Sequence, residues 1–171
     1  MRVVLTGFMG AGKTTVGRRL SELAGVPFID LDERIERRFG ASVREIFARQ
    51  GEPAFRAAER QELESALSPD PAVVATGGGT LTFPENLELA RERGLVVWLH
   101  PTFATLARRV GGLGKSDRPL FRDEEQAFAL YRERLSAYAG ADLTVDVGAE
   151  ESIDEVAGRL RLLLLERGCS I

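Results

Sequence analysis

Short apolar runs alternate with amphipathic stretches along the whole chain. The apolar runs predict five β-strands, over residues 2–6, 26–30, 72–76, 95–99 and 143–147. The third run is apolar at every position before Thr76, which is typical of a strand that helices cover on both faces of a parallel sheet. A parallel sheet built from helix-connected strands is therefore expected.

Positions with helical periodicity fill the intervals between these runs. They predict helices over residues 13–24, 84–93, 102–110, 123–139 and 152–167, and a helical zone over residues 31–67 that breaks near Gly40 and Gly51. Ser42 is a plausible N-cap, with Glu45 at the capping-box position. The alternation predicts one α/β domain over residues 1–171, a doubly wound five-stranded parallel sheet with ligand sites beyond the carboxyl ends of its strands.

Composition narrows the classes of protein that fit this pattern. The chain has 171 residues and a net charge of −3, which disfavours broad binding to the phosphate backbone of nucleic acid. Its single cysteine, Cys169, cannot form an internal disulfide, and no cluster of cysteine and histidine suggests structural zinc. The first apolar stretch is too short for a secretory signal, and the run 162–165 is too short to span a membrane. We expect a cytoplasmic monomer without nucleic-acid or membrane partners.

Lysine is rare in this chain, which has only Lys13 and Lys115 among 23 basic residues. Lys13 lies in the sequence Gly-Phe-Met-Gly-Ala-Gly-Lys-Thr at residues 7–14, which satisfies the P-loop pattern between a predicted strand and a predicted helix. Such a loop turns backbone N–H groups toward phosphates, its lysine reaches the outer phosphates, and its threonine offers a hydroxyl to Mg²⁺. The expected ATP-binding residues are Gly10, Ala11, Gly12, Lys13, Thr14 and Thr15.

The surroundings of the P-loop separate classes of nucleotide-binding protein. Neither lysine follows an asparagine, so the Asn-Lys-x-Asp element of GTPases is absent. The third predicted strand ends in Thr76 and three glycines, not in the aspartate that holds the metal in large ATPases. Acidic residues instead lie at the end of the second predicted strand, as Asp30 and Asp32. This arrangement favours a small-molecule kinase.

Six motifs together give the chain a close resemblance to the shikimate kinase family, whose fold is that of the nucleoside-monophosphate-kinase type. They are the P-loop, Asp30-x-Asp32, the motif Ile46-Phe47-x-x-x-Gly51-Glu52-x-x-Phe55-Arg56-x-x-Glu59, Gly77-Gly78-Gly79, Arg118-Pro119-Leu120, and Tyr131-Arg132-x-Arg134 with Tyr138. The resemblance implies transfer of the γ-phosphoryl group of Mg-ATP to the 3-hydroxyl group of shikimate, a step on the way to chorismate and the aromatic amino acids.

The resemblance also implies a role for each motif. Lys13, Asp32 and Arg118 would be catalytic, with Asp32 orienting or deprotonating the attacking hydroxyl and Arg118 also binding ATP from a mobile lid over residues 111–122. Thr14 and Asp30 would hold Mg²⁺, Asp30 through water. The acceptor would lie on the helical region 31–67 and contact Asp32, Arg56, Gly78, Gly79 and Arg134. Glu59 follows Arg56 by one helical turn, so it is expected to pair with Arg56 and fix the orientation of its guanidinium group. Phe47 and Phe55 either form an apolar wall around the acceptor ring or belong to the core.

Several alternatives stay open on the sequence alone. A gluconate kinase or a nucleoside monophosphate kinase shares this fold, and a non-catalytic nucleotide-binding module would also keep a P-loop. Asp32 has a purely structural alternative, which is to cap the following helix. The arginine that family members often place against adenine near the last strand has no counterpart at residues 148–151, so Arg109 becomes the candidate for that contact.

Overall fold

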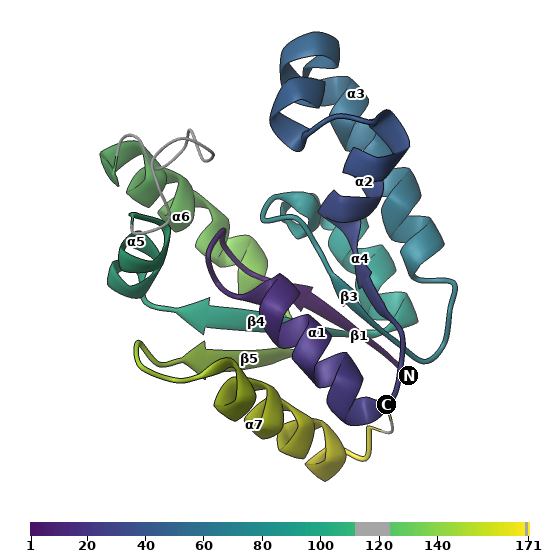
Figure 1. Ribbon diagram of the computed structural model, residues 1–171, viewed down its shortest axis with the longest axis vertical. Helices are drawn as coiled ribbons and strands as arrows, with labels where there is room; N and C mark the ends of the chain where they lie inside the picture. Colours follow the sequence, from purple (N-terminus) through teal and green to yellow (C-terminus); the bar gives the residue numbers. More distant parts are fainter. Residues whose placement is uncertain (112–123, 170) are drawn as a thin grey trace.

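The five predicted strands form one parallel sheet. The computed structural model describes residues 1–111, 124–169 and 171 (Figure 1). The strands are β1 (Arg2–Thr6), β2 (Phe28–Asp30), β3 (Ala72–Ala75), β4 (Leu95–Pro101) and β5 (Leu143–Val147). Their order in the sheet is β2-β3-β1-β4-β5, and every neighbouring pair is parallel. The predicted fold class is therefore confirmed, with β1 in the centre.

Helices connect the strands at nearly the predicted positions. They are α1 (Lys13–Ala24), α2 (Leu31–Phe39), α3 (Val43–Ala66), α4 (Pro84–Arg93), α5 (Phe103–Gly111), α6 (Glu124–Tyr138) and α7 (Ile153–Glu166), with a short 3₁₀ helix, η1 (Thr80–Thr82), that the sequence did not predict. Strand β2 is shorter than predicted because the N–H of Val26 still bonds to Ser21 at the end of α1 and Pro27 has no N–H to give.

Helices lie on both faces of the sheet (Figure 1), and alternate residues of β1 belong to different buried clusters. Val3 and Leu5 belong to a buried cluster with Leu20 of α1 and Leu160 of α7. Val4 belongs to a second cluster, which includes buried residues of α3 and α4. Both faces of the sheet are thus covered, which explains why the strands are apolar at nearly every position.

Helices α2 and α3 extend away from the sheet and carry a small core of their own (Figure 1). Ile35, Ile46 and Phe55 form that core. Ser42 caps α3 in a capping box with Glu45, as predicted. Gly51 interrupts α3 with φ 80° and ψ 166°, a backbone conformation that favours glycine, and this is the predicted break.

The predicted lid falls largely on residues 112–123, outside the described residues, so Arg118 and Lys115 are not placed. Helix α5 ends at Gly111 and α6 begins at Glu124 on either side of this segment. Across the described ranges, no helix combines the length and the apolar character that crossing a membrane requires.

Helix α7 offers a direct test of the packing. Leu160 is fully buried against the sheet, whereas Leu162 on the same helix is 62% exposed. We expect Leu160→Ala to lower the free energy of unfolding by about 2–5 kcal/mol, because it removes buried methyl groups and leaves a cavity. Leu162→Ala should change it by less than about 0.5 kcal/mol. Urea unfolding measures both, and equal losses would contradict the packing described here.

Candidate active site

The P-loop lies between the centre of the sheet and the start of α1. Gly7 has φ 138°, and a Cβ placed on it would lie 2.6 Å from the carbonyl oxygen of Leu99. Gly12 has φ 97° and caps α1 without any side-chain hydrogen bond. The first N–H groups of α1 therefore have no side-chain acceptor at the cap, and together with the helix dipole they favour an anion at this end.

Three side chains that follow Gly12 are held close to the loop. The Nζ of Lys13 donates to the carbonyl oxygens of Gly7 at 2.8 Å and Phe8 at 3.1 Å, so the ammonium group folds back over the loop. The hydroxyl of Thr14 donates to Oδ2 of Asp30 at 2.7 Å, and the hydroxyl of Thr15 donates to the carbonyl of Gly12 at 3.1 Å. The P-loop is thus tied directly to the carboxyl end of β2.

The two aspartates at the end of β2 and the start of α2, Asp30 and Asp32, have different surroundings. Oδ1 of Asp30 accepts from the N–H of Glu33 at 3.2 Å, so Asp30 is the N-cap of α2 and the capping alternative for Asp32 is wrong. Asp32 is half-buried and is the second residue of α2. The pKa of Asp32 is raised to about 6, mainly because burial disfavours its charged form. The positive charge of Lys13 lowers this pKa, and the carboxylates of Asp30, Glu59 and Glu36 raise it.

The triple glycine after β3 brings the site together. A Cβ on Gly77 would lie 2.9 Å from Oδ1 of Asp32, so this backbone passes directly beside the carboxylate. A Cβ on Gly79 would lie 3.1 Å and 3.2 Å from the terminal nitrogens of Arg56 and 3.3 Å from one of Arg134. Two guanidinium groups, one from α3 and one from α6, therefore approach the same glycine. No side chain larger than hydrogen fits there without displacing them.

Arg56 is held by carboxylates and aromatic rings. One terminal nitrogen donates to Oε2 of Glu59 at 2.8 Å, and Nε donates to Oε1 of Glu52 at 3.1 Å. Its guanidinium carbon also lies within 5.2–5.8 Å of the ring centres of three phenylalanines, Phe47, Phe55 and Phe83. These contacts keep the charged fork in one place. The predicted pairing of Glu59 with Arg56 is present.

Arg134 has a different environment from Arg56. Its guanidinium carbon lies 5.9 Å from the ring centre of Phe8 in the P-loop. The hydroxyl of Tyr138, one helical turn after Arg134, donates a hydrogen bond to the carbonyl of Gly78 at 2.6 Å. Burial raises the pKa of Tyr138 to about 12, so this hydroxyl is protonated at neutral pH. Among the described residues, Arg134 forms no ion pair with a carboxylate. A guanidinium fork is the group that best matches a carboxylate or phosphate.

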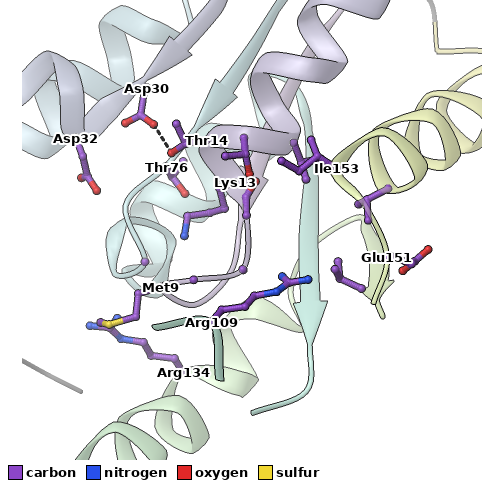
Figure 2. A pocket seen from close by; sticks show the side chains of 18 of the residues that line it. Met9, Lys13, Thr14, Asp30, Asp32, Thr76, Arg109, Arg134, Glu151 and Ile153 are labelled. Atoms are coloured by element: carbon purple, nitrogen blue, oxygen red, sulfur yellow. Dashed lines mark hydrogen bonds between the residues drawn. The ribbon is translucent and has the colours of Figure 1, made fainter. Parts of the chain in front are cut away.

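One cavity of about 1340 Å³ connects these groups. Its lining includes the P-loop from Met9 to Val16, Asp30, Asp32, Gly78 and Arg134, and it continues past Arg109 to residues 149–153. In Figure 2, Asp32 and Arg134 lie on one side of Lys13, while Arg109, Glu151 and Ile153 lie on the other. The cavity is thus long enough to have two ends of different chemistry, with the phosphate loop between them.

Some predicted site residues lie next to this cavity and some lie outside the described chain. Gly79 and Arg56 are not among its lining residues, but Gly79 lies beside the guanidinium groups of both Arg56 and Arg134, and Arg134 lines the cavity. Phe47 lines it, and Phe55 lies behind in the small core. Arg118 belongs to residues 112–123. Sequence analysis did not single out Phe83, because a single phenylalanine before the helix proline belongs to no motif, yet its ring lies against Arg56.

Comparison with known proteins identifies the family. The family model described as shikimate kinase matches residues 9–164. A shikimate kinase of Geobacter metallireducens is 42% identical over 92% of this chain and 90% of its own length, and one of Cereibacter sphaeroides is 44% identical over 96% and 83%. The structure of shikimate kinase from Acinetobacter baumannii in complex with shikimate is 35% identical in sequence and superimposes with a TM-score of 0.90. The match covers 97% of this chain and 93% of the Acinetobacter chain. The chain belongs to the shikimate kinase family.

Proposed function

We propose that this chain transfers the γ-phosphoryl group of ATP to the 3-hydroxyl group of shikimate in the cavity described above. The observation that carries the proposal is the meeting of Lys13, Asp32 and Arg134 in one cavity, with Arg56 beside it at Gly79. In this proposal Lys13 binds phosphates, Asp32 accepts the hydroxyl proton, and the two guanidinium groups bind a carboxylate. Family membership supports the same reaction.

The nucleotide occupies the half of the cavity that runs from the P-loop toward α7. Backbone N–H groups of Gly10 to Thr15 bind the phosphates, and Lys13 leaves its carbonyl partners for the outer phosphate oxygens. The base lies toward Arg109, which donates to the carbonyl of Gly148 at 3.3 Å and faces residues 149–153 across the cavity. This supports Arg109 as the adenine contact in place of the arginine missing at residues 148–151.

Thr14 and Asp30 fit a magnesium ion that is shared with the nucleotide. The hydroxyl hydrogen of Thr14 is given to Asp30, so the lone pairs of the Thr14 oxygen are left to a cation. The described residues contain no group of three acidic, histidine or cysteine side chains that could hold a metal. Phosphate oxygens and water, which are ligands that Mg²⁺ prefers, would complete the shell. When bound, the ion neutralises charge on the transferring phosphoryl group.

The acceptor occupies the other half of the cavity. Arg56 and Arg134 hold its carboxylate at Gly79, Gly78 and Gly79 offer backbone N–H groups, and Asp32 accepts the hydrogen of the 3-hydroxyl group. The hydroxyl oxygen attacks the γ-phosphorus in line, its proton passes to Asp32, and the bond to the β–γ bridging oxygen breaks to release ADP. With its pKa near 6, Asp32 is ionised at neutral pH and able to accept that hydrogen.

We further propose that residues 1–171 form a single domain and that residues 111–122 close as a lid with Arg118 over the nucleotide. We also propose that the protein is a monomer in the cytoplasm without nucleic-acid or membrane partners. Closure would exclude water that otherwise hydrolyses ATP.

The first test is coupled ADP release with Mg-ATP and shikimate, with gluconate and AMP as control acceptors. We expect turnover with shikimate alone, lowered at least about 100-fold by Asp32→Ala because the proton acceptor is lost. Turnover with a control acceptor only would overturn the acceptor assignment. No turnover with any of them would favour a non-catalytic nucleotide-binding module.

Arg134 should act on acceptor binding. We expect Arg134→Ala to raise the KM for shikimate at least about tenfold, since a charge-assisted contact to the carboxylate is lost, and to leave the KM for ATP within about twofold. The control is Arg132→Ala, because Arg132 is exposed on the same helix and does not line the cavity. Equal effects of the two substitutions on the KM for shikimate would contradict the assignment.

Asp32 should also cost the folded protein stability at neutral pH. Its folded-state pKa is raised from 3.8 to about 6, so stability present below pH 4 is lost as the pH rises through 6. Asp32→Asn removes this cost and should raise the free energy of unfolding at pH 7–8 by about 2–3 kcal/mol, a gain that disappears toward pH 4.

Urea unfolding across this pH range measures the effect. The control is Glu88→Gln on the exposed face of α4, which should show no comparable gain. If Asp32→Asn instead lowers the free energy of unfolding at pH 8, the ionised Asp32 carboxylate does not destabilise the folded protein and the prediction is wrong.

A further inference from the structure

Glu59 is a buried carboxylate whose two oxygens have different partners. Its side chain is 1% exposed. Oε2 accepts from Arg56 at 2.8 Å, and Oε1 accepts from the hydroxyl of Thr80 at 2.6 Å. A buried carboxylate is stable only when hydrogen bonds and charge compensate its lost hydration. The orientation of Glu59 therefore depends on Thr80 as well as on Arg56.

Arg56 has a second carboxylate partner that cannot replace Glu59. Glu52 contacts its Nε and one terminal nitrogen at 3.1 Å, but the Glu52 side chain is 60% exposed. An ion pair with an exposed partner contributes little to stability and does not hold the two side chains in one geometry. The inner contact with Glu59 is thus the one that fixes the direction of the guanidinium group toward Gly79.

Thr80 is itself held from several sides. It is fully buried in η1, directly after the triple glycine. Its N–H donates to the carbonyl of Gly77 at 3.2 Å, and its own carbonyl accepts from Nδ2 of Asn86 at 2.9 Å. The Oδ1 of Asn86 in turn accepts from Arg60 of α3 at 3.0 Å. Thr80 therefore has a fixed place relative to both the glycine turn and α3.

We propose that Thr80 is a positioning residue for the acceptor: its hydroxyl orients Glu59, and through Glu59 it aligns the Arg56 guanidinium with the glycine turn. The two surfaces proposed to hold the acceptor carboxylate come from different elements, α3 and the loop after β3. Thr80 is bonded to both, since its backbone closes the turn and its hydroxyl reaches α3. The inference rests on the proposed function in taking shikimate as the acceptor.

The substitution that isolates this contact is Thr80→Val, which keeps the side-chain shape and removes the hydroxyl. We expect the KM for shikimate to rise roughly tenfold, the effect of losing one hydrogen bond to a charged group. The kcat should stay within about threefold, and the KM for ATP within about twofold, because the P-loop and Asp32 are untouched. Thr80→Ser retains the hydroxyl and should restore most of the affinity.

A matched control separates positioning from stability. Ser21 of α1 is also buried, and its hydroxyl donates to the carbonyl of Arg18 at 2.7 Å, away from the cavity lining. Ser21→Ala should lose stability without changing the KM for shikimate. If Thr80→Val does not fold, Thr80→Ala compared with Thr80→Ser provides the same contrast.

The outcomes divide cleanly. An unchanged KM for shikimate in Thr80→Val, or equal changes in kcat and both KM values, would overturn the proposal and leave Thr80 a structural residue. A similar rise in Ser21→Ala would also overturn it. Shikimate-dependent turnover of the unsubstituted protein is measured in the same assay. Its absence would overturn the proposed function, and this inference with it, whereas its presence with an unaffected Thr80→Val would overturn the inference alone.

Discussion

The site depends on one constraint, the parallel direction of the strands. Because all five strands point the same way, the segments that follow β1, β2 and β3 leave the sheet at the same edge. Those segments are the P-loop, the Asp30–Asp32 pair and the triple glycine. Their sequence separation is large, yet Thr14 bonds to Asp30 at 2.7 Å, and a Cβ on Gly77 would lie too close to Oδ1 of Asp32, at 2.9 Å. Reversing any one strand would remove its segment from the cavity.

The sequence predicted the elements whose signals are local. The P-loop, the capping box at Ser42 and the break at Gly51 each depend on a few adjacent residues, and each lies where it was expected. The start of β2 was missed because an apolar run does not reveal where hydrogen bonding to the neighbouring strand begins. The cap of α2 was assigned to Asp32 as an alternative, but Asp30 takes it, since two aspartates two residues apart give equivalent local patterns.

The part of the site that sequence reasoning could not supply is long-range. Thr80 and Asn86 carry no catalytic signature, and their importance lies in bonds to Glu59 and Arg60, 21 and 26 residues earlier in the chain. Phe83 is similar, since it contacts Arg56 across two elements. Motif spacing finds residues that touch a substrate. The residues that hold those side chains in place become visible only when the helices have been packed on the sheet.

The two arginines of the proposed acceptor site differ: Arg56 is held in a fixed position by the protein, whereas Arg134 supplies a less compensated positive charge. Arg56 lies between Glu52 and Glu59, so most of its charge is already compensated within the protein, and three aromatic rings surround it. Arg134 forms no such pair within the described residues, and in the proposed site its charge would attract the acceptor carboxylate. Two uncompensated guanidinium groups at Gly79 would repel each other before the acceptor arrived. Because Glu52 and Glu59 pair with Arg56, the repulsion between the two guanidinium groups is lower and Arg56 is held in place. The charge of Arg134 would then attract the carboxylate of the proposed acceptor.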